Sequence, residues 1–79
     1  MFVTVRVINS QGNPEYAAKV SIGYGSVIFG GVTPDQRTGT DGETEFEINA
    51  STSDRIKIYA NGNTVYEDYA KPKITVHLR

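Results

Sequence analysis

The sequence predicts an all-β domain, an antiparallel β-sandwich of about seven short strands, and three observations lead to this. Val and Ile dominate the aliphatic residues, Leu occurs once, and Thr and Tyr are plentiful, a composition that suits a pleated sheet. Turn residues interrupt the chain every eight to twelve residues or so, the spacing typical of a sandwich or barrel. Apolar residues alternate with polar ones in several segments, and no segment shows helical spacing.

Length and charge limit the classes of protein to consider. The chain has 79 residues, with 8 Lys and Arg, 9 Asp and Glu, one His and no Cys. One domain over residues 1–79 buries only ~60–65% of its unfolded surface, so we expect no large enclosed active site. Without Cys there is no disulfide framework and no thiolate zinc site. A net charge of −1 with scattered basic residues indicates no nucleic-acid or membrane partner.

The chain shows no targeting signal. No apolar run approaches the ~20 residues that cross a bilayer. The first residues lack the basic-then-apolar layout of a signal peptide, so the residues alone indicate a soluble chain that is not exported.

The predicted strands follow from period-2 alternation. Residues 3–7, 18–24, 44–48, 56–60 and 74–78 each place apolar side chains on one face. Asn61-Gly62 predicts a type I′ hairpin, because both central positions need positive φ, and residues 64–69 return antiparallel. The inward residues expected in the core are Val3, Val5, Val7, Val20, Ile22, Phe46, Ile48, Ile56, Ile58, Ile74, Val76 and Leu78.

Two segments lack a clear pattern. Residues 32–42 are polar and are predicted to form an exposed loop. Val27-Ile28-Phe29 is apolar on both parities and carries no charge, so at a sheet edge it is the segment most prepared to pair with another chain. We therefore predict a homodimer or other self-association through residues 27–32, with Val27 and Ile28 as contact residues.

Several of these segments resemble one family of sandwich domains. The opening similarity lies in Val3-x-Val5-x-Val7, Gly12-Asn13-Pro14 and Ala18-x-Val20-x-Ile22, and the central one in Thr38-x-x-Asp41-Gly42-x-Thr44-x-Phe46. Ile56-x-Ile58-x-Ala60-x-Gly62 and Ile74-x-Val76-x-Leu78 complete it. Together they resemble the carboxypeptidase regulatory-like domains, which are transthyretin-like seven-stranded sandwiches. The alternation with glycine turns also resembles bacterial Ig-like domains of the invasin type.

Both resemblances imply the same kind of fold and role. They imply a Greek-key sandwich that serves as a non-catalytic accessory, adhesive or spacer module of envelope or secreted proteins. They carry no catalytic residue over to this chain. The chain departs from the first family at Gly39, where Asp is usual, at Thr44, where an aromatic residue is common, and at Asn63, where Tyr commonly follows the glycine.

The acidic segment Glu43–Glu47 is a candidate for a catalytic carboxylate pair. Its alternating glutamates lie ~7 Å apart on one face, which is in the range of a glycosidase pair. Polar turns flank the strand, so nothing desolvates one carboxyl to raise its pKa. We expect a solvated face whose glutamates pair with basic residues of neighbouring strands, either Lys57 or the face of Lys73 and Arg79.

The sequence gives little support for a metal site or for a serine nucleophile. Asp35, Asp41 and Glu43 offer oxygens for calcium, but their spacing matches no EF-hand and Asp41-Gly42 is explained as a turn. His77 lies on the outward parity of the last strand, and one His builds no structural zinc site. It is also the sole base for a serine nucleophile, and no nucleophile elbow is present. We expect no enzyme, no metal and no cofactor.

Tyrosines are the feature nearest to a binding signal, since the chain has five of them. Tyr59 falls on the outward parity and Tyr66 lies across the hairpin, so the two rings are candidates for one exposed face that binds sugar or a protein partner. Cross-strand packing that steadies the sheet is the favoured interpretation. We therefore expect a structural, adhesive or accessory module, and the alternative is a carbohydrate-binding module.

Overall fold

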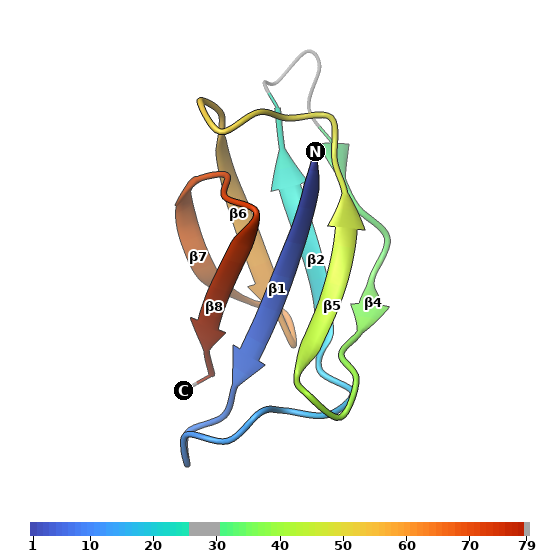
Figure 1. Ribbon diagram of the computed structural model, residues 1–79, viewed down its shortest axis with the longest axis vertical. Coiled ribbons are helices and arrows are strands. Elements are labelled where there is room, and N and C mark those ends of the chain that lie inside the picture. The colour runs from blue at the N-terminus through green and yellow to red at the C-terminus, as the bar shows by residue number, and fades with distance from the viewer. Residues whose placement is uncertain (26–30, 79) are drawn as a thin grey trace.

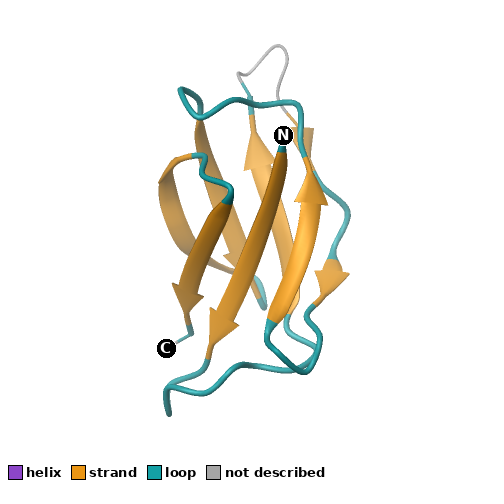
Figure 2. Cartoon of the chain, viewed as in Figure 1, coloured by secondary structure: helices purple, strands orange, loops and turns teal. Residues whose placement is uncertain are grey.

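The computed structural model describes residues 1–25 and 31–78, and over these residues it is all-β. Two sheets face each other, an arrangement consistent with a β-sandwich (Figure 1). The three-stranded sheet has β1 (Phe2–Ile8) in its middle, with β5 (Glu43–Glu47) antiparallel on one side and β8 (Lys73–His77) parallel on the other. Strands make up most of the described chain, and loops join them at both ends of the molecule (Figure 2).

The five-stranded sheet is built around β2 (Lys19–Tyr24). Its order is β3-β2-β6-β7, formed with β3 (Gly31–Val32), β6 (Arg55–Ala60) and β7 (Asn63–Tyr69). The fifth strand, β4 (Gln36–Arg37), also pairs with β2. Every strand pair in this sheet is antiparallel.

The structure has eight strands over the described residues, not about seven, because one edge strand is interrupted. β3 pairs with the end of β2 and β4 pairs with its start. Pro34 lies between them and has no N–H to donate to a ladder. Thr33 bridges the break, since its N–H donates to the Ile22 carbonyl and its Oγ1 accepts from the Ile22 N–H, both over 2.9 Å. Part of the predicted exposed loop is therefore an edge strand.

The core matches the inward residues predicted from alternation, with one exception. Leu78 is half-buried and packs against the margin of the core, because it follows β8 at an open side of the two sheets. The buried apolar side chains are Val3, Val5, Val7, Ala18, Val20, Ile22, Phe46, Ile48, Ile56, Ile58, Ala60, Ala70, Ile74 and Val76. The row on β1 is fully enclosed, so this strand forms the centre of one layer.

Thr38 contradicts the expectation of an exposed loop, because its side chain is buried. Its Oγ1 accepts a hydrogen bond from the Ala18 N–H over 2.9 Å and donates to the Glu15 carbonyl over 2.5 Å. Its backbone N–H donates to the Ala18 carbonyl. A small polar side chain is stable there because both of its hydrogen-bonding functions are used.

Gly42 is also buried in this connection, for a different reason. Its φ is +77°, and a Cβ at this position would lie 2.7 Å from the Val7 carbonyl oxygen. The Gly42 carbonyl accepts the Val7 N–H over 2.8 Å. Only glycine allows the backbone to approach β1 so closely, so the turn that precedes β5 fixes how β5 joins β1.

The hairpin prediction is confirmed. Asn61 has φ +51° and Gly62 has φ +85°, and β7 returns antiparallel to β6 from Asn63 to Tyr69. The register shifts between Ile58 and Tyr59, which marks a β-bulge close to the hairpin. The bulge changes which side chains of β7 face the core.

We predict that Phe46→Ala lowers the free energy of unfolding by ~3–5 kcal/mol, which is comparable with the whole stability of a domain this small. Phe46 is 1% exposed and is the largest fully buried side chain. Phe2→Ala is the matched control, because Phe2 is 58% exposed and should change stability little. Urea unfolding of both variants measures the difference, and equal midpoints would contradict the burial of Phe46.

A second prediction concerns the buried hydroxyl. Thr38→Val keeps the side-chain volume but leaves the Ala18 N–H and the Glu15 carbonyl without their side-chain partner, so unfolding should become easier by about 1–3 kcal/mol. Thr40→Val is the control, because Thr40 is exposed. Thermal denaturation of the two variants decides it, and an unchanged melting temperature for Thr38→Val would refute the role of the hydroxyl.

Candidate functional site

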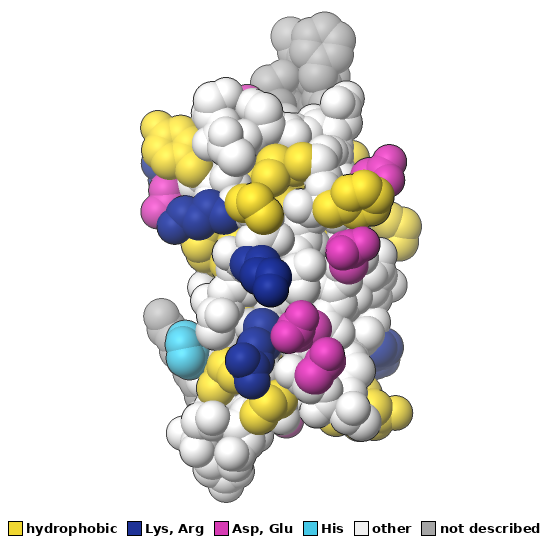
Figure 3. Space-filling model, viewed as in Figure 1, with side chains coloured by type: hydrophobic (Ala, Val, Ile, Leu, Met, Phe, Trp, Pro, Cys, Tyr) yellow, Lys and Arg dark blue, Asp and Glu magenta, His cyan; other side chains and the backbone are white. Residues whose placement is uncertain are grey.

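The glutamate side chains of β5 lie on the outer face of the three-stranded sheet. Glu43 is opposite Arg6 of β1, and Glu45 is opposite Thr4, whose other neighbour is Lys73 of β8. The acidic side chains therefore lie at one side of this face and the basic ones at its centre and other side, which Figure 3 shows from the front. The face is charged and open to solvent, which gives its carboxylates no apolar pocket.

The expected pairing of these glutamates with Lys57 is wrong. Lys57 lies on β6 of the other sheet, and its Nζ is 3.2 Å from Oε2 of Glu67 on β7. Both side chains are more than half exposed, so the pair contributes only a few tenths of a kcal/mol. Arg79 lies outside the described residues.

The oxygen-rich turn before β5 is occupied by local hydrogen bonds. Oδ1 of Asp41 accepts from the Glu43 N–H over 2.9 Å, and the Gly42 N–H donates to the Gly39 carbonyl over 3.0 Å. Over residues 1–25 and 31–78, no three His, Cys, Asp or Glu side chains come together as a metal site. Asp41 thus acts in the turn, as its neighbour Gly42 suggested.

Tyr59 and Tyr66 do not share one exposed face. Tyr59 is opposite Thr64 on β7, but the bulge puts Tyr66 opposite Ile58, which points into the core. Tyr66 is half-buried and packs against the core cluster. Alternation places Tyr66 on the wrong face because β7 has one extra residue, Val65, which moves every later residue of the strand to the opposite face.

The hydroxyl of Tyr66 is held by its own strand. It donates to the Tyr69 carbonyl over 2.6 Å. Burial raises the pKa of Tyr66, the neighbouring charge of Asp68 raises it further, and Arg55 opposes the rise. The Arg55 guanidinium lies 5.5 Å from the centre of the Tyr69 ring. Tyr66 therefore has a structural role at the edge of the sheet.

Tyr59 covers a glycine on the outer face of the five-stranded sheet. A Cβ added at Gly23 would lie 3.4 Å from Cε2 of the Tyr59 ring, so the ring rests against bare backbone of β2. This contact fills the space that a side chain on β2 would otherwise occupy. A shallow depression of about 210 Å³ adjoins it, lined among others by Gly23, Gly25, Arg55, Lys57, Tyr59 and Glu67.

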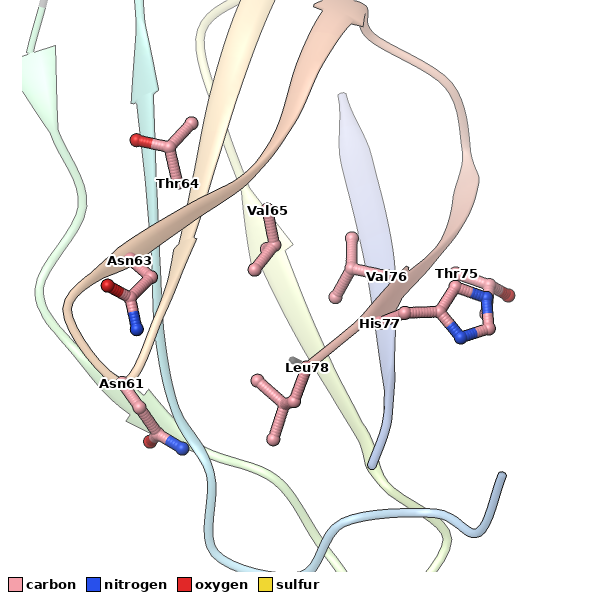
Figure 4. Close-up of a pocket in the computed structure, with 8 residues that line it drawn as sticks. All are labelled: Asn61, Asn63, Thr64, Val65, Thr75, Val76, His77 and Leu78. Atoms are coloured by element: carbon pink, nitrogen blue, oxygen red, sulfur yellow. The ribbon is translucent and has the colours of Figure 1, made fainter. Parts of the chain in front are cut away.

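A larger groove of about 710 Å³ lies between β7 and β8. In Figure 4, Val65 of β7 and Val76 and Leu78 at the β8 side point into the space between the strands, whereas His77 points away from it. Asn61 and Asn63 lie at its hairpin end. Sequence reasoning missed this groove because it depends on which strands become neighbours. The one local signal was Val65, the single aliphatic residue of β7.

The predicted self-association segment falls largely outside the described residues, and this includes both Val27 and Ile28. Val32, at the end of that segment, lies in edge strand β3 and is 65% exposed. Self-association through residues 27–32 stays a prediction.

Comparison with known proteins identifies no relative. No family model matches the chain, and no curated protein or solved structure matches it. In the described part of the chain there is no helix long and apolar enough to cross a membrane.

Proposed function

We propose that this chain is a non-catalytic structural, adhesive or accessory module of a larger surface or secreted assembly. We further propose a Greek-key sandwich of transthyretin-like or Ig-like type as the finer description of its fold, on the strength of the sequence resemblance. The observation that carries the functional proposal is the parallel pairing of β1 with β8.

The first and last strands are parallel neighbours. Hydrogen bonds from the Thr4 N–H to the Pro72 carbonyl and from the Leu78 N–H to the Ile8 carbonyl, each 2.8 Å long, close the two ends of the β1–β8 ladder. Because the strands run in the same direction, the start of β1 and the end of β8 lie at opposite ends of the molecule (Figure 1). The molecule is elongated, with extents of 37 × 20 × 19 Å.

This geometry suits a module that carries tension. Force applied at the two ends pulls β1 and β8 past each other, so the hydrogen bonds of their ladder share the load and must break together. A hairpin pulled open from one end breaks its bonds one after another. Forced unfolding depends on the unfolding rate, which a shared load keeps low.

The distribution of polar groups also supports a non-catalytic role. Among the described residues, the buried side chains are apolar except for Ser21 and Thr38. The carboxylates of β5 and the imidazole of His77 lie on an outer face, where water solvates them. General acid–base catalysis instead needs titratable groups that converge on a shielded space.

We predict that Thr4→Pro lowers the force needed to unfold the domain, because proline removes the Thr4 N–H that bonds Pro72 in the β1–β8 ladder. Pulling a chain of identical copies in an atomic force microscope measures it. Thr75→Pro is the matched control, since alternation turns the Thr75 N–H away from β1. Its unfolding force should stay near that of the parent. An equal drop in unfolding force for both variants would contradict the prediction that the β1–β8 ladder carries the load.

The alternative, a carbohydrate-binding module, is favoured by one observation. The half-buried ring of Tyr59 faces outward beside the shallow depression, with the Lys57–Glu67 ion pair within the same lining. An aromatic face flanked by hydrogen-bonding groups is suited to a sugar ring.

A glycan array tests this alternative. If the domain is a carbohydrate-binding module, a defined polysaccharide binds the parent and Tyr59→Ala loses that binding at least tenfold, the size expected for removing a central aromatic contact. Tyr16→Ala is the control, because Tyr16 is 67% exposed and lies away from the depression. An array without bound glycans, or equal binding by both variants, would exclude the Tyr59 site.

A further inference from the structure

The groove between β7 and β8 arises because the two sheets differ in width. The five-stranded sheet has four strand positions, since β3 and β4 occupy the same side of β2, whereas the other sheet has three. At one side the sheets are held together, because Oγ1 of Thr44 on β5 donates to Oε1 of Gln36 on β4 over 2.7 Å. The extra width is therefore on the opposite side, where β7 extends beyond β8.

The groove lies where a further strand could be added beside β8. Its floor is apolar, formed by Val65, Val76 and Leu78, and the last two continue the inward row of β8 (Figure 4). Val65 and Leu78 are half-buried although both pack against the core cluster. A strand laid beside β8 would cover these side chains with its own inward-facing residues.

The outer edge of β8 also offers backbone hydrogen bonds. The Leu78 N–H donates to the Ile8 carbonyl and the Thr4 N–H donates to the Pro72 carbonyl, so the even-numbered residues of this parallel ladder bond β1. By alternation, the N–H and C=O groups of Lys73, Thr75 and His77 point away from β1, and Thr75 and His77 line the groove. Among the described residues, no strand pairs with this edge.

Charge on this edge selects the incoming strand. Lys73 and His77 point out from β8, Lys71 precedes it, and Arg6 lies beside Thr75 on β1. Among the described residues that line the groove there is no Asp or Glu. Acidic side chains at alternate positions of an added strand would lie directly opposite Lys73 and His77.

We propose that the edge of β8 is a docking site for an extended segment of a partner protein, which adds as a fourth strand and alternates apolar with acidic residues. Main-chain hydrogen bonds to Lys73, Thr75 and His77 would hold it, and its apolar residues would cover Val65 and Leu78. This mode of recognition is strand addition at a sheet edge. The inference goes beyond the proposed function and does not depend on it, because the groove is available whether or not the module carries load.

A second folded copy fits this site less well. Two β8 strands paired antiparallel about Thr75 would place Lys73 of each copy opposite His77 of the other, with no acidic residue between them. The strand with the right pattern, β5, has its apolar Phe46 buried in its own core. Its sequence is nevertheless a suitable probe as a free peptide.

The test uses a synthetic peptide with the sequence of residues 42–48, Gly-Glu-Thr-Glu-Phe-Glu-Ile, with blocked ends. Titration into isotopically labelled domain should shift the amide NMR signals of Lys73, Thr75 and His77 and slow their hydrogen exchange. A peptide with Lys in place of each Glu should bind about tenfold more weakly, and added salt should reduce this difference.

Two variants locate the site. Lys73→Glu should reverse the preference, so that it binds the lysine peptide better than the glutamate peptide. Thr75→Pro removes one free N–H at the edge and should weaken both peptides. Arg37→Glu is the control for net charge, because Arg37 is exposed on β4, at the side of the other sheet away from the groove, and it should bind as the parent does.

The results distinguish a partner strand at the β8 edge from a second copy of the domain. Slowed exchange at the β8 edge together with the charge reversal supports strand addition. Signal changes confined to residues outside the groove, or an unaltered preference in Lys73→Glu, would overturn it. A dimer seen by sedimentation of the peptide-free domain and broken by Thr75→Pro would also overturn it, since the edge would then be filled by a second copy.

Discussion

The fully buried valine row of β1 is the constraint on which the rest of the structure depends. Val3, Val5 and Val7 have no exposed surface, and β1 is the one strand of its sheet with a partner on both sides. Its partners come from the middle and the end of the chain, so the layer forms only when segments about 40 and 70 residues apart in sequence meet. Burial of that row is what offsets the entropy of closing such long loops.

The two sides of the molecule are closed by different means, and this asymmetry produces its candidate sites. On the β4–β5 side, the Thr38 hydroxyl fixes residues 15–18, Gly42 brings the backbone against β1, and Thr44 bonds Gln36. On the β7–β8 side a short connection leads from one sheet to the other, with the Ala70 N–H bonded to the Asp54 carbonyl. The apolar margin of the core formed by Val65 and Leu78 lies open there as a groove.

Period-2 alternation predicted the core because inward and outward positions are a local property of each strand. It placed Phe46 inside and the β5 glutamates outside, and Asn61-Gly62 predicted the hairpin for an equally local reason, its positive φ angles. It failed at Tyr66, since a bulge of one residue reverses parity and leaves no clear mark in the sequence. Thr38 was missed because its partners, Glu15 and Ala18, are about 20 residues away. The groove was beyond reach for the same reason, because it depends on strand order and on the relative widths of two sheets.

The same strand, β8, takes part in both proposals through its two edges. One edge bonds β1 in the ladder that a pull at the two ends would load, and the other edge lies beside the groove. A strand added to the free edge would cover Leu78 and add main-chain hydrogen bonds to β8, but it would leave the β1–β8 ladder unchanged. Since a ligand that binds only the folded state stabilises it, partner binding at the groove would slow the detachment of β8 from the folded domain. A module with this arrangement would resist tension along its long axis most strongly when a partner strand is bound to the free edge of β8.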